Sequence, residues 1–132
     1  MKLQRIRGVL MCSAIAMAPL LATAHHSVQG QFDVRKNVAT EGTLTRVELI
    51  NPHSYLHFNV KNAAGKEEEW SFETAAPLAL KRAGISVRDS LKTGRSYKFT
   101  YSPARKPNEK IGLLHSIVLE DGKFVAVSAG SN

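Results

Sequence analysis

The stretch NPHSYLHF, residues 51–58, decides the predicted fold because it joins two β-like runs through a proline corner. Pro52 has no amide hydrogen to donate to a strand, and it disfavours helical geometry at Asn51 before it. After the corner, polar and hydrophobic residues alternate, so that His57 falls on the face opposite Phe58. This two-residue period is typical of a half-buried strand.

The same reading, extended outward, predicts five strands and one helix. The strands are expected over residues 40–50, 55–60, 67–73, 96–101 and 111–119. After Thr74 the period changes, and a short helix is expected over residues 75–83, with Pro77 in its first turn and Gly84 at its end. Three strands, a helix and two strands follow the order of the OB barrel. We therefore expect a mainly β fold, a small five-stranded OB-like antiparallel barrel with one short helix between strands 3 and 4; an α+β sheet is the alternative.

The first 24 residues have the features of a secretory signal peptide. A basic start is followed by an apolar run over residues 9–22, and residues 22–24, Ala-Thr-Ala, form a small-x-small cleavage pattern. The apolar run is too short to read as a membrane span. We expect residues 1–24 to be removed and residues 25–132 to form a single periplasmic or secreted barrel domain, with no membrane span after cleavage.

Composition narrows the functional classes. Cleavage leaves 108 residues and lowers the formal charge from +7 to +4, because three basic residues are removed. Cys12 is removed with the signal peptide, so the mature chain has no cysteine for a disulfide, a thiolate metal site or a nucleophile. The basic residues form no stripe, which argues against a nucleic-acid partner. The sequence has no phosphate loop or nucleophile elbow. Asp33, Glu73 and His53 could form an acid–base group, but their spacing in the sequence does not indicate one. A non-enzymatic role is therefore favoured.

Histidines gather at the predicted mature N-terminus. Cleavage after Ala24 would give His25 a free amine beside its own imidazole, and these two nitrogens can chelate one ion. A third nitrogen, from His53 in the first place or His26 in the second, would complete an open, nitrogen-rich set that suits Cu(II). Cleavage after Ala22 would place His25 third in the chain, where amine, backbone amides and ring also chelate Cu(II) or Ni(II).

Each of these histidines also has a structural interpretation. Two histidines behind a signal peptide can be a loose end, and His53 can serve only to fix the turn. His115 lies in an apolar strand pattern and is typical of a core histidine. Glu73 can pair with Lys81 or Arg82 at the junction of strand and helix.

An ordered set of short motifs resembles a family of small secreted bacterial proteins known as domain of unknown function 6152. The motifs are HHS at 25–27, FD at 32–33, GTL at 42–44, NPH at 51–53, WSFE at 70–73, PLAL at 77–80 and RAG at 82–84. The resemblance implies a periplasmic barrel with no established activity. The chain departs from the family pattern at Val28, Ile85 and Arg95, where an aromatic residue, a tryptophan and an aspartate are usual.

Two functional hypotheses follow. In the first, the barrel binds a metal ion, copper above others, through His25, His53 and His26. The residues expected to orient a ligand or to bind beside it are Asp33, Asn51, His57, Glu73 and Arg82. In the second, the barrel binds no metal, and a face with Tyr55, His57 and the loop 102–110 holds a small ligand or an envelope protein.

Overall fold

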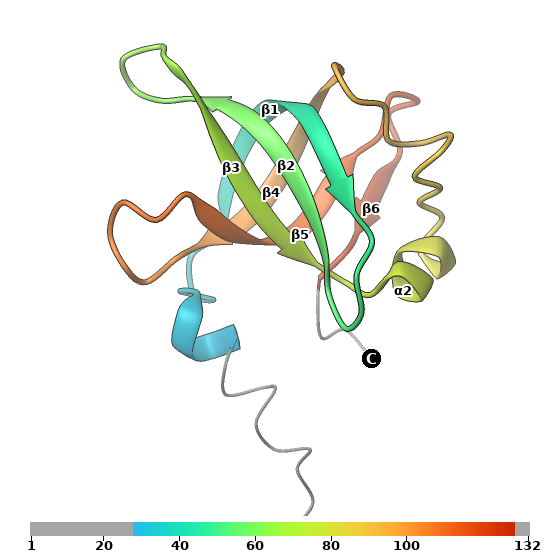
Figure 1. Cartoon of the computed structure of the whole chain (residues 1–132), viewed down its shortest axis with the longest axis horizontal. Helices are drawn as coiled ribbons and strands as arrows, with labels where there is room; N and C mark the ends of the chain where they lie inside the picture. Colours follow the sequence, from blue (N-terminus) through green and yellow to red (C-terminus); the bar gives the residue numbers. More distant parts are fainter. Residues whose placement is uncertain (1–27, 129–132) are drawn as a thin grey trace, which may run out of the picture.

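The computed structural model describes residues 28–128 and contains every predicted element, with ends shifted by one or two residues. The elements are β1 (Val38–Glu48), β2 (Ser54–Lys61), β3 (Glu67–Thr74), α2 (Pro77–Arg82), β4 (Ser96–Pro103), β5 (Ile111–Val118) and β6 (Phe124–Ala126). A helical turn at residues 28–31 precedes β1 (Figure 1). The short C-terminal strand β6 is not among the predicted elements.

The sheet closes into a barrel. β1 pairs antiparallel with both β2 and β4, β2 pairs with β3, and β4 pairs with β5. A short parallel pairing between β3 and β5, from Ser71↔Ile111 to Glu73↔Leu113, completes the ring, and β6 adds to the other end of β5 (Figure 1). The predicted five-stranded OB-like barrel with a helix between β3 and β4 is confirmed, and this parallel seam is the one departure from antiparallel pairing among its strands.

Aromatic side chains fill the interior of the barrel, as their alternation predicts. The ring centroids of Phe58 and Phe99 lie 4.5 Å apart in a stacked pair, and Phe72 meets Phe99 edge-on at 4.8 Å. Gly112 permits the seam, because a Cβ there would lie 2.6 Å from a ring carbon of Tyr101 and 2.9 Å from the ring of Phe72. The barrel is therefore a packed core, and its polar chemistry lies on the outside and at its ends.

Two local details complete the fold. β1 has an irregularity between Leu44 and Arg46, and Gly42 lets β2 approach closely. The N-cap of α2 is Ala76, without a side-chain hydrogen bond, and the Thr74 hydroxyl donates to the Val127 carbonyl at 2.6 Å. Within residues 28–128, no helix has the length and apolar character needed to cross a membrane.

Candidate functional site

His53 lies in the loop between β1 and β2, directly after the cis peptide bond that joins Asn51 to Pro52. Its ring nitrogen Nδ1 is 2.5 Å from the carboxylate oxygen Oε1 of Glu73 on β3. The pairing of β2 with β3 creates this contact, because it sets Glu73 opposite Tyr55, two residues beyond His53. The contact is an ion-pair distance rather than one of the hydrogen bonds of the structure. When the neutral ring carries its hydrogen on Nδ1, toward this carboxylate, Nε2 keeps a free lone pair. The side chain of His53 is 29% exposed and that of Glu73 only 11%.

A small cavity of about 100 Å³ adjoins this pair. Glu73 and Tyr55 line it from the barrel, and Gln31 and Phe32 line it from the segment before β1; Ser71, Ile111 and Gly112 complete the wall. Burial raises the pKa of Tyr55, and the carboxylates of Glu73 and Glu48 raise it further. The phenol therefore stays protonated at neutral pH and can donate a hydrogen bond. The N-terminal segment and Glu73, the partner of His53, thus line the same small cavity.

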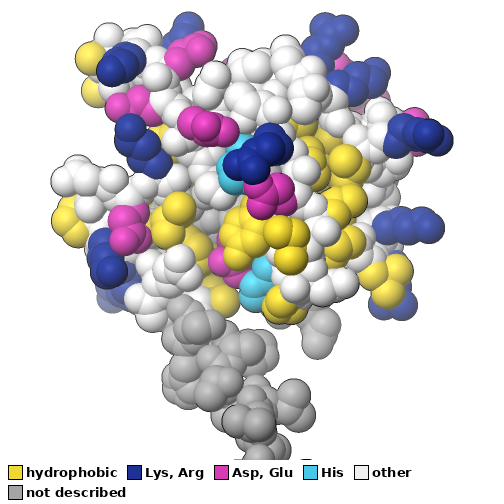
Figure 2. Space-filling model, viewed as in Figure 1, with side chains coloured by type: hydrophobic (Ala, Val, Ile, Leu, Met, Phe, Trp, Pro, Cys, Tyr) yellow, Lys and Arg dark blue, Asp and Glu magenta, His cyan; other side chains and the backbone are white. Residues whose placement is uncertain are grey.

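His57 lies farther along the outer face of β2, but it is only 8% exposed. Its Nδ1 is 3.5 Å from a guanidinium nitrogen of Arg46, and its Nε2 is 3.3 Å from an oxygen of Glu48. Arginine can only donate, so Nδ1 accepts and Nε2 carries the hydrogen toward Glu48, although that contact does not have hydrogen-bond geometry. Arg46 and Glu48 form an ion pair with each other. His57 is therefore covered by charged partners rather than open to a ligand. Figure 2 shows this face, where histidine, acidic and basic side chains mix with hydrophobic ones.

The remaining predicted site residues have other partners, are exposed, or precede the described residues. Asp33 is buried, and its ionic partners are Arg35 at 3.3 Å and Lys36 at 3.8 Å. Burial raises the pKa of Asp33, but the hydrogen bond and charge of Arg35, with help from Lys36, outweigh it and hold the pKa below its ordinary value. Asn51 is exposed in the loop, Arg82 is exposed at the end of α2, and His25 and His26 precede the described residues.

The ion pair expected between Glu73 and Lys81 or Arg82 is absent from the described part of the chain, where Glu73 pairs with His53. Across residues 28–128, no three histidine, cysteine, aspartate or glutamate side chains are grouped to hold a metal. A three-residue metal site around His53 would therefore need ligands from before residue 28.

His115 forms a structural hydrogen-bond chain. Ser102 Oγ donates to the Lys36 carbonyl at 2.8 Å, and His115 Nε2 lies 2.6 Å from the same oxygen. Because that hydroxyl hydrogen is already donated, Nε2 is the donor to Ser102, the reverse of what a serine nucleophile needs. Burial lowers the pKa of His115, which favours the neutral ring. This contact was not foreseen from the sequence, since 13 residues separate the partners.

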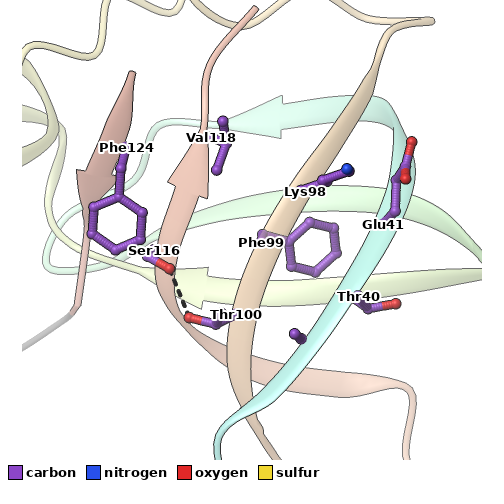
Figure 3. Close-up of a pocket in the computed structure, with 9 residues that line it drawn as sticks. Thr40, Glu41, Lys98, Phe99, Thr100, Ser116, Val118 and Phe124 are labelled. Atoms are coloured by element: carbon purple, nitrogen blue, oxygen red, sulfur yellow. Dashed lines mark hydrogen bonds between the residues drawn. The ribbon is translucent and has the colours of Figure 1, made fainter. Parts of the chain in front are cut away.

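A separate apolar groove lies on the outside of β1, β4, β5 and β6, with a volume of about 330 Å³ (Figure 3). Phe124 of β6 stands on one side and is 66% exposed. Thr100 and Ser116 cross its floor with a 2.7 Å hydrogen bond. Glu41 of β1 and Lys98 of β4 also line the groove, and no predicted site includes it.

A family model matches residues 12–113 of the chain, and its description reads "family of unknown function (DUF6152)". The chain belongs to the DUF6152 family. The match covers most of the sequence, including the proline corner, Glu73 and the β3–β5 seam. No curated protein and no solved structure matches the chain. The family assignment names no activity, so the function of this DUF6152 member must be argued from its own residues.

Proposed function

We propose that the mature protein is a periplasmic barrel that binds a copper(II) ion between its N-terminal histidine and His53. After cleavage at Ala24, His25 would supply an amine and a ring nitrogen, and His53 Nε2 would supply a third nitrogen; His26 is the alternative third donor. The single observation that supports this most is the 2.5 Å contact between His53 Nδ1 and Glu73. Metal-binding histidines commonly donate their other ring hydrogen to a carboxylate, and Glu73 is close enough to His53 Nδ1 to serve as that carboxylate.

The length of chain before residue 28 is compatible with the proposal. Gln31 and Phe32 line the same cavity as Glu73. His26 lies five residues before Gln31, and an extended chain of that length covers at most about 18 Å. The N-terminal ligands therefore start from an anchor beside the His53–Glu73 pair rather than from the far end of the barrel.

The available donor atoms favour Cu(II) over softer ions. The single cysteine is Cys12 and the last methionine is Met17, so the chain after the predicted signal peptide contains no sulfur. Nitrogen and oxygen donors suit Cu(II), whereas thiolate and thioether ligands select Cu(I) and structural zinc. Copper bound in this way would be held through nitrogen donors, with Glu73 orienting one ring.

Copper titration of correctly processed protein tests the proposal. Mass spectrometry first establishes that the mature chain begins at His25. We expect weaker Cu(II) binding in the double variant His25→Ala/His26→Ala and in His53→Ala, and unchanged binding when a glycine is added after Asn132. Equal Cu(II) affinity in the wild type and all three variants would refute the proposal.

A second candidate function is the binding of a small apolar ligand or an envelope protein without metal. The apolar groove beside Phe124 favours it (Figure 3). The loop 102–110 supports it less, because the guanidinium of Arg105 is engaged with the Gln29 carbonyl. Loss of binding of a hydrophobic fluorescent dye in Phe124→Ser, with copper binding intact, would assign this activity to the groove. Equal dye binding by Phe124→Ser and wild type would exclude the groove.

A further inference from the structure

The cavity of about 100 Å³ that Glu73 lines lies on the outside of the parallel seam between β3 and β5. Ser71 and Glu73 line it from β3, and Ile111 and Gly112 line it from β5. Because Phe72 turns into the core, its two neighbours on the strand point outward. Barrel closure therefore builds the floor of this cavity, which we call the seam cavity.

The segment before β1 supplies the opposite wall of the seam cavity, and contacts within the described chain hold that wall in place. Phe32 is 1% exposed and forms a β-bridge with Ala104. The Gln31 carbonyl accepts a hydrogen bond from the Arg105 amide at 2.9 Å. The wall is thus formed before any ligand arrives, and a preformed site loses less entropy on binding.

Four polar side chains line the seam cavity, and each of them can accept a hydrogen bond. They are the carboxylate of Glu73, the hydroxyls of Tyr55 and Ser71, and the side-chain amide of Gln31. Within residues 28–128, the two hydroxyls and the amide have no hydrogen-bond partner. The ionic partner of Glu73 is His53, which contacts only the oxygen Oε1. The cavity therefore offers several free acceptor atoms to a ligand.

The charge of the seam cavity is negative. Among the described residues that line it there is no lysine or arginine, and the side chain of Glu73 is only 11% exposed. A neutral imidazole at His53 leaves the charge of this carboxylate in place. A charge with little water around it attracts an opposite charge more strongly than an exposed one does. A primary ammonium group has one positive charge, three N–H donors and no acceptor, so it complements this lining.

We propose that the seam cavity binds the primary ammonium group of a small molecule, with Glu73 as its ionic partner and the hydroxyls of Tyr55 and Ser71 as hydrogen-bond acceptors. Gln31 and Ile111 also line a second pocket of about 420 Å³, which can hold the rest of the molecule. This site goes beyond the proposed copper function, because it is built entirely from described residues and does not use His53 as a ligand.

Titration with ethanolamine, followed by ¹H–¹⁵N NMR, tests the proposal. Ethylene glycol and choline are the matched probes: the first has a similar size without the charge, and the second keeps the charge without an N–H donor. We expect ethanolamine to shift the amide signals of Ser71, Glu73 and Gly112, and the other two probes to leave them unchanged. Equal shifts from all three probes, or no shift from ethanolamine, would overturn the proposal.

Substitutions locate the ammonium group. We expect ethanolamine to bind about tenfold more weakly to Glu73→Gln, the scale of a hydrogen bond to a charged group, and about fivefold more weakly to Tyr55→Phe, the scale of a neutral one. Glu69→Gln is the control, because it loses the same charge on the same face of β3, where the hydrogen bond of Glu69 is to Thr45. Wild-type affinity in Glu73→Gln would place the amine elsewhere and refute the site.

The ammonium group can come from a free amine or from a lipid head group. Cosedimentation with phosphatidylethanolamine vesicles, compared with phosphatidylcholine vesicles, distinguishes these sources. Binding of ethanolamine alone indicates a soluble amine, and binding of the phosphatidylethanolamine vesicles as well indicates the head group. Either result supports the seam cavity when Glu73→Gln weakens it.

His53→Ala separates the seam cavity from the copper site. The substitution removes a proposed copper ligand but leaves the carboxylate of Glu73 without a competing partner. Cu(II) binding should therefore weaken, while ethanolamine binding stays or tightens. Loss of ethanolamine binding in a His53→Ala protein that unfolds like the wild type in urea would refute the ammonium site. A wild-type protein that binds ethanolamine but no copper would refute the copper proposal alone.

Discussion

Replacing Glu73 by glutamine isolates the contact on which the proposed site depends. The carboxylate lies 2.5 Å from His53 Nδ1, and its side chain is 11% exposed. Glutamine keeps the size and one acceptor oxygen but removes the charge. Loss of the carboxylate that orients a metal-bound histidine typically weakens metal affinity about 10- to 100-fold. That range corresponds to about 1.4–2.8 kcal/mol of binding free energy.

The assay is competitive Cu(II) titration of processed protein against a chelator of known affinity. Glu69→Gln is the control, because Glu69 lies on the same outer face of β3 and loses the same charge, while its hydrogen bond is to Thr45 rather than to a histidine. We expect Glu69→Gln to bind as wild type does. Urea unfolding of both variants checks that the barrel is intact.

The result that would refute the reasoning is wild-type affinity in Glu73→Gln while His53→Ala loses binding. His53 would then act without an orienting partner. An independent measurement is the ring tautomer of His53 in the metal-free protein, read from long-range ¹H–¹⁵N NMR correlations. We expect the hydrogen on Nδ1 in the wild type and a mixture of tautomers in Glu73→Gln.

Three further predictions concern the barrel. Burial lowers the pKa of His115 from 6.5, so the unfolded chain binds the proton more readily than the folded one. The free energy of unfolding should therefore fall as the pH drops from about 6.5 to the folded pKa, by at most about 1.4 kcal/mol per pH unit. His115→Gln should flatten that slope in urea titrations. The pKa of Asp33 is held below 3.8, so the ionised carboxylate stabilises the folded protein above that pH and this stabilisation is lost in acid. The unfolding curves of wild type and Asp33→Asn should therefore converge as the pH falls through the folded pKa. Gly112→Ala should cost about 1–3 kcal/mol of unfolding free energy, because its Cβ would enter the rings of Tyr101 and Phe72, and a wild-type urea midpoint would contradict that packing.

Local periodicity determined most of the fold. The alternation after Pro52 places Phe58 in the core and His57 on the outer face, and the same two-residue spacing turns Tyr97, Phe99 and Tyr101 toward the interior. These features depend only on neighbouring residues, because successive side chains of a strand point to opposite faces. The order of strands and helix then left few barrel topologies to choose from. The signal peptide and the copper ligands before residue 28 stay predictions of the sequence.

The tertiary structure decided which distant polar groups meet. Glu73 could as well have paired with Lys81 or Arg82, and only the register of β2 against β3 brings it to His53. The irregularity in β1 sets how Arg46 and Glu48 cover His57, so an outward-facing histidine is buried all the same. The hold of Arg105 on Gln29 arises in the same way. Such contacts depend on strand register and barrel closure, which join residues far apart in the chain, and no local pattern of side chains encodes them.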